Sequence, residues 1–434
     1  MDQQSTSSPA LESEVDSRGM FSWWTSIPLY FRILIGLFFG VGVGMLLHGK
    51  EQVLGITTVK LLNILGAITG LILRLLGALA PPLILVAVLD TLIKAKLSGG
   101  VARKMIFLLV TNTLAAILIG LFVANIVQPG AHANLHVVHD GETSSVHGNP
   151  WEALLSNVPE SLFKPLVDNN VIGVILVAAA FGVALRRLPE DDRKIAENMV
   201  SVAFRAIAIV LHWVIELVPL GVFGIIAKVV GTKGFEPFRS LAWFVLSVVI
   251  ALVLQLCFYL TRIKLGTWVN PLKLIGDMKD AIVMAFSTDS STATMPVTYR
   301  CLIKNVGLRD ESARMGSMVG TNFNNDGTAL YEAMSALFVS QLIGMHLTFV
   351  QQLMVVLTSI VASIGAAGIP EAGLVTMTLV FAAVGLPKEY IGILLTVDWF
   401  LDRCRTVINM FGDVNVSCML DGKTRGEAPQ QSLI

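Results

Sequence analysis

Long apolar stretches, separated by short polar segments, dominate the chain up to about residue 270. A helix needs about 20 apolar residues to cross a hydrocarbon core about 30 Å thick. We therefore predict membrane-spanning helices, with the Pro81-Pro82 pair breaking the second of them. The stretches lie at 29–47, 61–93, 105–127, 170–185, 203–230 and 241–261.

The pattern changes after about residue 270, where three polar or glycine-rich clusters interrupt the apolar stretches. Backbone that leaves a helix inside a bilayer exposes amide groups, which protein, water or an ion must satisfy. The first and third clusters lie between short apolar arms, which predicts two re-entrant helical hairpins, with Pro296 starting the second arm of the first. The second cluster predicts an unwound helix, and such segments mark a pocket near the membrane midplane. The clusters are STDSSTATMP (287–296), GTNFNNDGTALYE (320–332) and SIGAAGIPEAG (363–373).

The composition agrees with an integral membrane protein. Of 434 residues, 54% are hydrophobic and 14% are charged, and the formal net charge is +0. No basic run is concentrated enough to bind nucleic acid. The first 26 residues lack a signal-peptide pattern and predict a disordered cytoplasmic tail. The segment 131–150 has no Lys or Arg, which places it outside, and its histidines favour a hydrated loop over a metal site.

Polar side chains form a stripe on the last hydrophobic helix, at 391–414. They recur at intervals that share one side of a helix. Ionisable groups in a membrane helix generally face the protein interior, so the stripe predicts a binding site, the alternative being an ion-pair stripe between helices. Arg405 offers a planar fork for a carboxylate, Asp402 can receive an ammonium group, and the oxygens further along suit Na⁺ or H⁺. The stripe consists of Asp398, Asp402, Arg405, Thr406, Asn409 and Asp413.

The cluster at 320–332 carries further oxygen ligands. Asn322, Asn324, Asp326 and Thr328 alternate with other residues next to glycines, which is typical of hard-cation chemistry. An ordinary polar loop is the alternative. Glu332 follows on the same segment, as either a proton carrier or a hydrogen-bonded structural acid. The glycine-rich cluster at 363–373 predicts a tip that can approach a ligand closely and can hinge, the alternative being a tight surface loop.

Four ordered motifs resemble the dicarboxylate/amino acid:cation symporter family, which includes the excitatory amino acid transporters and bacterial glutamate and C4-dicarboxylate symporters. The match runs from about Pro150 to Asp413. Any one motif alone would be a weak signal, but four in order are specific. They are SSTATMPVT (290–298), NNDGTALYEA (324–333), SIGAAGIPEAGLVTM (363–377) and VDWFLDRCRTVINMFGD (397–413).

The resemblance implies an all-α polytopic membrane protein with eight transmembrane helices and two re-entrant hairpins. It also implies a homotrimer in which each protomer moves a transport domain against a scaffold, as an elevator. The expected divisions are a cytoplasmic tail at 1–26, scaffold helices 1–2 at 27–100, transport-domain helix 3 at 101–128, scaffold helices 4–5 at 129–232, the rest of the transport domain at 233–418, and a cytoplasmic tail at 419–434.

The resemblance also assigns site residues. Arg405 would bind the substrate side-chain carboxylate and Asp402 its amino group, with Thr406 and Asn409 beside them. The first hairpin tip would hold the α-carboxylate through Ser290 and Ser291, and Thr328 would line the same pocket. Glu332 matches the proton carrier of the animal transporters. Sodium would be held at three sites, by Asp413 with Gly320, Asn324 and Asn409, by Asn322, Ser363, Ile364 and Ala366, and by Asp326 with Asn324, Asn112 and Thr113.

Four positions depart from the family pattern. Asn325 replaces a methionine linked to ion coupling, Leu109 stands where a tyrosine is common, and Glu371 replaces a small residue or glutamine. Asp289 stands where relatives carry small residues or an arginine. Because a buried acid without a partner is costly, we expect Asp289 to pair with Arg403 close to the substrate site.

These observations predict a secondary transporter, not an enzyme, that couples Na⁺ and/or H⁺ to the symport of glutamate or aspartate. The first alternative is a C4-dicarboxylate symporter of the same fold. An intramembrane hydrolase lacks a general base, since only His212 and His346 lie near helical segments, and an anion channel is a third alternative. No organic cofactor is expected. Membrane lipid is the expected partner around the protein. The expected location is a plasma membrane, and the short loops and tails favour a bacterial inner membrane.

Overall fold

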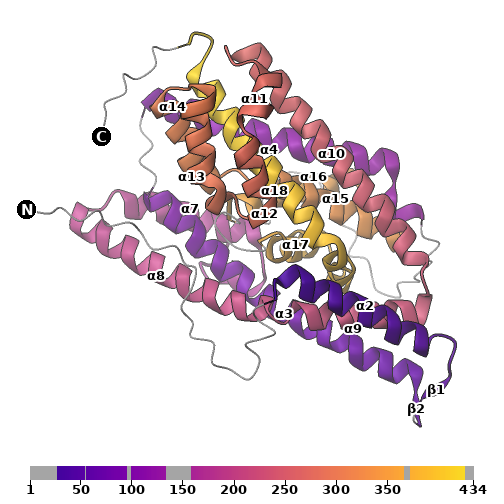
Figure 1. Cartoon of the computed structure of the whole chain (residues 1–434). Coiled ribbons are helices and arrows are strands. Elements are labelled where there is room, and N and C mark those ends of the chain that lie inside the picture. Colours follow the sequence, from indigo (N-terminus) through magenta and orange to yellow (C-terminus); the bar gives the residue numbers. More distant parts are fainter. Residues whose placement is uncertain (1–26, 54, 95–98, 133–157, 366–371, 426–434) are drawn as a thin grey trace, which may run out of the picture.

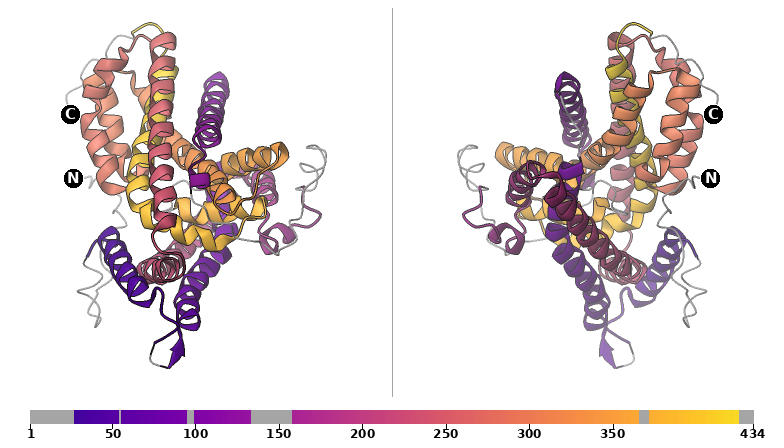
Figure 2. Two further views of the ribbon diagram at one scale, coloured as in Figure 1. Left: turned by 90° about the vertical axis from the view of Figure 1, so that its right-hand side faces the viewer. Right: turned by 90° about the vertical axis from the view of Figure 1, so that its left-hand side faces the viewer.

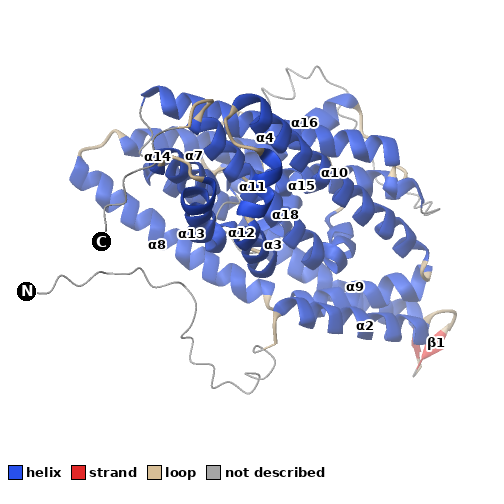
Figure 3. Cartoon of the chain, turned by 45° about the horizontal axis from the view of Figure 1, so that its top comes forward, coloured by secondary structure: helices blue, strands red, loops and turns tan. Residues whose placement is uncertain are grey.

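The computed structural model is almost entirely helical over the part of the chain that it describes (Figure 3). Short strands β1 (Gln52–Val53) and β2 (Ile56–Thr57) form one antiparallel hairpin. Five of the described helices are long and apolar enough to cross a membrane, as predicted for a polytopic protein. The structure describes residues 27–53, 55–94, 99–132, 158–365 and 372–425.

One group of helices packs around α3 and α9 (Figure 1). Glycines let these backbones approach closely: a Cβ at Gly36 of α2 would lie 2.4 Å from the Pro219 carbonyl oxygen of α9. Small residues at such a crossing are what close helix packing in membranes requires. The members of this first helix group are α2 (Leu29–Leu47), α3 (Thr58–Lys94), α7 (Val171–Arg186), α8 (Glu190–Ile215) and α9 (Val218–Lys233).

The second helix group surrounds α15, which is buried along nearly its whole length. Figure 2 shows its C-terminal elements above the indigo start of the chain. A helix that is buried on every side needs no polar face, which is why apolar and small residues predominate after Thr328. The members are α4 (Gly99–Val127), α10 (Glu236–Gly266), α12 (Lys279–Thr288), α13 (Ser291–Cys301), α15 (Asp326–Leu342), α16 (Phe349–Gly365), α17 (Ala372–Ala383) and α18 (Ile391–Asp421).

Short elements connect these helices. They are η1 (Pro129–His132), α6 (Lys164–Val167), α11 (Pro271–Asp277), η2 (Leu302–Val306), α14 (Asp310–Arg314), η3 (Met315–Val319), η4 (Gly320–Asn322) and η5 (Lys388–Tyr390). Helix α18 continues to Asp421, past the start of the tail expected at 419. The Asp421 carboxylate accepts hydrogen bonds from Arg309 and from Trp268 Nε1, which anchors this end of the helix.

Two sequence predictions about the spans are wrong. Helix α3 runs through Pro81 and Pro82 without a break, because each proline removes only its own amide hydrogen bond and neighbouring helices hold the rest. The stretch predicted as one span at 203–230 is two helices, α8 and α9. The chain turns there at Glu216, which pairs with Arg32 of α2, and Pro219 occupies the first turn of α9, where no amide donor is needed.

The three interruptions have the predicted character but different bounds. The first hairpin turns at Asp289 and Ser290 alone, so the prediction that Pro296 starts the second arm is wrong: α13 begins at Ser291 and contains the proline. The second cluster leaves the helix between η4 and α15, which confirms the predicted unwinding. In the third cluster α16 ends at Gly365 and α17 begins at Ala372, and residues 366–371, including Ala366 and Glu371, lie outside the described residues.

Candidate functional site

The polar stripe of α18 faces the interior of the second helix group. Asp398, Thr406, Asn409 and Asp413 are buried, and the Arg405 side chain is completely buried, with 0% of its surface exposed. A guanidinium removed from water is costly without compensating charges and hydrogen bonds. The contacts of Arg405 therefore decide what this region can bind.

Arg405 lies between two carboxylates of its own helix. Its Nη2 donates to Asp402 Oδ1 at 2.6 Å, and its Nη1 lies 3.0 Å from Asp398 Oδ1. The guanidinium carbon is 4.0 Å from the centre of the Tyr331 ring of α15, a cation–π contact. On the side of α17 it lies against Gly373, where a Cβ would come 3.1 Å from Nη1. The pocket floor therefore joins α15, α17 and α18.

One donor of Arg405 remains available. Nε is buried and makes no hydrogen bond to any described residue, whereas Nη1 already lies 3.0 Å from Asp398 Oδ1. Buried donors are nearly always satisfied, so an acceptor is expected there. A carboxylate matches a guanidinium fork in shape and charge. The arrangement is therefore suited to binding an anionic ligand.

The amide of Asn409 joins α18 to the start of α15. Its Oδ1 accepts the Gly327 amide at 2.8 Å, and its Nδ2 lies 3.4 Å from Thr328 Oγ1 and 3.3 Å from Asn325 Oδ1. Gly327 permits this approach, because a Cβ there would lie 2.7 Å from the Arg405 carbonyl oxygen. Thr328 and Asn409 are thus brought together as expected. Thr406 is buried one position after Arg405.

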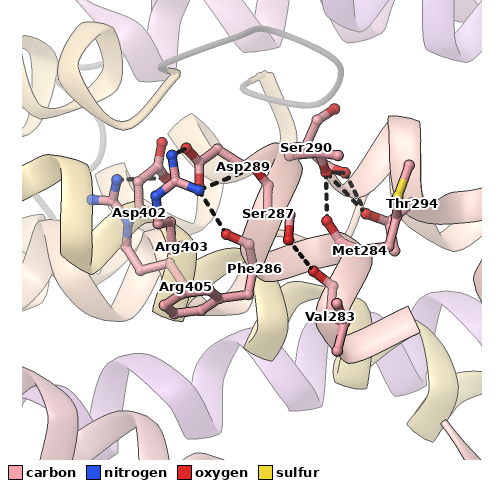
Figure 4. Close-up of polar contacts among 11 residues, drawn as sticks. Val283, Met284, Phe286, Ser287, Asp289, Ser290, Thr294, Asp402, Arg403 and Arg405 are labelled. Atoms are coloured by element: carbon pink, nitrogen blue, oxygen red, sulfur yellow. Dashed lines mark hydrogen bonds and ion pairs between the residues drawn. The ribbon is translucent and has the colours of Figure 1, made fainter. Parts of the chain in front are cut away.

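Asp289 and Arg403 lie together at the tip of the first hairpin (Figure 4). Arg403 Nη2 is 2.9 Å from Asp289 Oδ2, and Nη1 donates to the carbonyls of Phe286 and Ser287 at 2.8 and 3.0 Å. These carbonyls belong to the last turn of α12, where a cation is favourable. Asp289 itself adopts a left-handed conformation, with φ of 53°. Arg403 therefore caps α12 while Asp289 neutralises it.

The two serines expected to bind a carboxylate start the second arm. Ser290 is the N-cap of α13, and its Oγ accepts the Ala293 amide at 3.2 Å. Ser291 is the first helical residue and is partly exposed. The free amides of a helix start are a natural site for anions. Neither serine hydrogen-bonds to Arg405, so their common ligand stays a prediction.

Asp413 has the surroundings of a cation ligand. Its Oδ2 accepts from Thr321 Oγ1 at 2.6 Å and its Oδ1 from Asn324 Nδ2 at 3.0 Å. The Gly320 backbone lies against it, since a Cβ there would be 3.1 Å from Oδ1. Asn324 Oδ1 is buried and accepts no hydrogen bond from a described residue. A buried carboxylate beside a free amide oxygen and main-chain carbonyls fits Na⁺.

The other two proposed sodium sites are partly occupied by protein donors. Asn325 Nδ2 donates to the Ser363 carbonyl at 3.0 Å. Asp326 accepts from Thr113 Oγ1 at 2.6 Å and from the Tyr259 hydroxyl, and the amide oxygen of Asn112 accepts from Arg262. Ile364 lies in the last turn of α16, and Asn322 in η4. The structure thus brings Asp326 and Thr113 together, while Asn112 is bound elsewhere.

Glu332 is completely buried on α15. Its Oε1 accepts a hydrogen bond from Thr376 Oγ1 of α17, and its Oε2 makes no hydrogen bond to a described residue. The carboxyl therefore reaches from α15 to the second arm of the glycine-rich hairpin. That contact is compatible with both predicted roles of Glu332, proton carrier or structural acid.

Comparison with known proteins gives the family. The sequence profile of the sodium:dicarboxylate symporter family matches residues 29–423. The chain belongs to this family. The predicted resemblance is therefore confirmed, and the chain is an integral membrane protein.

Similar symporter-family proteins include excitatory amino acid transporters. The chain is 37% identical over 249 residues to excitatory amino acid transporter 1 of Bos taurus, which covers 56% of this chain and 45% of the relative. Excitatory amino acid transporter 2 of Mus musculus is 39% identical over 249 residues, covering 56% and 43%. An excitatory amino acid transporter of Caenorhabditis elegans is 38% identical over 252 residues, covering 56% and 49%. The chain thus spans about half the length of these relatives, which are transporters and not enzymes.

Three polar residues of this symporter-family site escaped the sequence analysis. Thr321 lies inside the polar cluster, so its hydroxyl was a visible signal, and it donates to Asp413. Tyr259 and Arg262 lie on α10, 67 residues before Asp326 and 150 residues after Asn112, and no local pattern marks them. Only the packing of α10 against α4 and α15 brings them to Asn112 and Asp326.

Proposed function

We propose that this protein is a secondary transporter that couples Na⁺ and/or H⁺ to the symport of an acidic amino acid. The observation that supports it most is the completely buried Arg405, whose Nε has no hydrogen-bond acceptor among the described residues. Its guanidinium would take the distal carboxylate of the substrate. Asp402, whose Oδ1 binds Arg405, would receive the substrate ammonium at Oδ2. Thr328, Thr406 and Asn409 would complete the pocket, with the start of α13 at Ser290 and Ser291 facing the α-carboxylate.

The charge of this region supports coupling to a cation. Two guanidinium groups, Arg403 and Arg405, face three carboxylates, Asp289, Asp398 and Asp402. The region is therefore negative before an anionic substrate enters. Like charges in a poorly solvated site repel each other by several kcal/mol, so a cation bound nearby would offset the substrate's charge. Bound Na⁺ would supply positive charge at Asp413 with Gly320, Asn324 and Asn409.

A C4-dicarboxylate is the second candidate substrate. The carboxylate of Asp402 is already paired with Arg405. A ligand that lacks an ammonium group would therefore still leave Asp402 with a cationic partner. The two substrates are separated by purified protein in liposomes, with aspartate, glutamate and succinate compared. Na⁺, H⁺ and K⁺ gradients are imposed one at a time. Succinate uptake without aspartate uptake would reject the amino-acid proposal, and currents that reverse with the chloride gradient would favour an anion channel.

The proposed mechanism is an elevator motion in a homotrimer with eight transmembrane helices per protomer. The first helix group would be the scaffold and the second the transport domain. In support, the helices pack more extensively within each group than between the groups, where α16 and α17 meet α3 and α7 and where α18 meets α2 and α9. The plasma membrane of a bacterium is the proposed location. Crosslinking between cysteines placed on α3 and α17 would test the motion, since substrate and Na⁺ should change the crosslinking rate.

Replacing Glu332 tests its role as proton carrier. Glu332→Gln keeps the shape and the bond from Thr376 but cannot exchange a proton. Uptake by the variant is expected to lose most of its dependence on pH between about pH 5 and 8 if this carboxyl carries the coupled proton. The measurement is initial uptake rate against external pH in liposomes. A pH profile that matches the wild type would leave Glu332 a structural acid.

The Asp289–Arg403 pair is tested by a double-mutant cycle. Asp289→Ala, Arg403→Ala and the double variant are compared in uptake rate, with Arg300→Ala on the same hairpin as a matched control, because Arg300 is exposed. The two losses are expected to be non-additive by about 1 kcal/mol, roughly fivefold. Arg403→Ala should be the worse single change, since it also leaves two carbonyls of α12 without their cap. Strictly additive losses would show that the pair contributes nothing to transport.

A further inference from the structure

A cavity of about 500 Å³ lies between α3 and the connection that leads from α17 into α18. It contains none of the residues assigned above to substrate or cations. Its α3 wall consists of positions that share one helix face, and three of them are small. Figure 1 shows α3 next to α17 at this point, in agreement with their packing. The lining residues are Gly70, Leu73, Arg74, Gly77, Ala78, Asn169, Pro387, Lys388 and Glu389.

Arg74 is the feature of this cavity that calls for a ligand. It lies 16 residues after the start of α3 and 20 before its end, so it is about 24 Å and 30 Å from the two ends of the helix. A charge at such depth is expensive and generally marks a functional site. Arg74 is nevertheless exposed, and no carboxylate of the described residues lies within 4 Å of it. Arg74 lines the cavity.

Lys388 brings a second cation to the same cavity from the other helix group. A Cβ at Gly77 would lie 3.8 Å from Lys388 Nζ, so the ammonium reaches the wall of α3 one helical turn from Arg74. Lys388 also has no carboxylate of the described chain within 4 Å. Glu389, next along η5, is exposed and is the one acidic residue among those lining the cavity. Two cations therefore face one carboxylate, with the Asn169 side chain beside them.

We propose that this cavity binds a protonated oxyanion, of which inorganic phosphate is the simplest. Arg74 and Lys388 supply donors to the anionic oxygens, and a planar fork matches two oxygens of a phosphate. Glu389 accepts the hydrogen bond of the remaining P–OH group. An oxyanion without a proton, such as sulfate or the phosphodiester of a phospholipid, meets Glu389 with two negative charges opposed and is disfavoured.

The bound anion bridges the two helix groups, because Arg74 belongs to the first and Lys388 to the second. Phosphate therefore favours the arrangement of the two groups seen here and slows their relative motion. This consequence for transport rests on the elevator motion proposed above. The binding itself does not, so it is measured separately on the purified protein.

The test uses the purified chain in detergent and isothermal titration calorimetry. Inorganic phosphate and inorganic sulfate are compared as their choline salts, at matched pH and ionic strength. Phosphate is expected to bind at least about tenfold tighter than sulfate. Arg74→Gln and Lys388→Gln are each expected to weaken phosphate about tenfold or more, since each removes a charge-assisted contact. Arg205→Gln, an exposed arginine of α8 that lies outside the cavity, is the matched control and should bind as the wild type does.

Glu389→Gln separates a protonated anion from any anion. The amide can donate to sulfate, so the preference for phosphate should fall to less than about threefold. Arg74→Lys serves if Arg74→Gln does not fold, because it keeps the charge and loses the fork. Equal phosphate binding by the wild type, Arg74→Gln and Lys388→Gln would overturn the proposal. If Glu389→Gln still preferred phosphate to sulfate as strongly as the wild type does, the proposal would also be wrong. The same holds if phosphatidylglycerol vesicles stabilised the protein in an Arg74-dependent way while phosphate had no effect.

Discussion

Arg405→Ala is expected to reduce the uptake of aspartate and glutamate by roughly 100-fold or more, while uptake of small neutral amino acids is retained or gained. The guanidinium is completely buried, and its Nε has no acceptor among the described residues. Removing one partner of a buried charged contact costs about 3 kcal/mol, which corresponds to about two powers of ten in affinity. The Asp398 and Asp402 carboxylates would lose their common cation and would repel the side-chain carboxylate of the substrate. The measurement is the uptake of labelled aspartate and of labelled alanine or serine by liposomes.

Arg405→Lys is the matched control for this change. It keeps the positive charge between Asp398 and Asp402 but loses the planar fork, so an intermediate defect in aspartate affinity is expected. If aspartate and glutamate uptake by Arg405→Ala equalled that of the wild type, the assignment of the distal carboxylate to Arg405 would be wrong. If Arg405→Ala lost the uptake of all substrates alike but kept a normal melting temperature, Arg405 would support the structure of the pocket without determining its substrate specificity.

Asp413→Asn is expected to raise the Na⁺ concentration needed for half-maximal uptake by roughly 30-fold. The carboxylate is buried beside the Gly320 backbone and the free Asn324 Oδ1, and the substitution removes the single formal negative charge of that set. A hard cation that loses its charged ligand keeps only neutral oxygens, a loss of about 2 kcal/mol in binding. The asparagine can still accept from Thr321, so the local fold is kept.

Na⁺ dependence of aspartate binding to the purified protein is the direct measurement, because it does not require a complete transport cycle. Asp280→Asn is the matched control: this exposed acid at the start of α12 loses the same charge far from the site and should leave the Na⁺ dependence unchanged. A wild-type Na⁺ dependence in Asp413→Asn would remove Asp413 from the cation ligands. If instead only the pH dependence changed, the coupled ion at this position would be H⁺.

Arg403 links the first hairpin to the first helix group. In this chain its guanidinium caps the last turn of α12 and also lies 4.9 Å from the centre of the Tyr30 ring of α2. Tyr30 belongs to the first helix group, so Arg403 touches both groups at once. Asp289 keeps the tip electrically neutral while Arg403 makes these contacts. Asp289 alone would repel an anionic substrate nearby. Because Arg403 pairs with it, an acid at this position is compatible with such a ligand.

Much of the architecture follows from local sequence patterns. Apolar length predicts membrane helices, polar interruptions at membrane depth predict broken ones, and the spacing on α18 predicts one buried polar face, because each depends on helix geometry within a few turns. The same reasoning fails at Pro81 and Pro82, where neighbouring helices hold α3 straight through, and at Pro296, which α13 accommodates. The helix-breaking propensity of proline is a local property, whereas the packing of neighbouring helices that overrides it depends on distant parts of the chain.

The sequence by itself determined that this is a helical membrane protein, that most of its polar chemistry lies after residue 286, and that Asp289 requires a cationic partner. Only the tertiary structure decided which groups meet across long intervals: Arg403 on the carbonyls of α12, Tyr259 and Arg262 on the oxygens of Asp326 and Asn112, and Arg74 opposite Lys388. Helical periodicity fixes which residues share a face of one helix. It carries no information on which helices pack together, because that depends on the combined burial of faces from the whole chain.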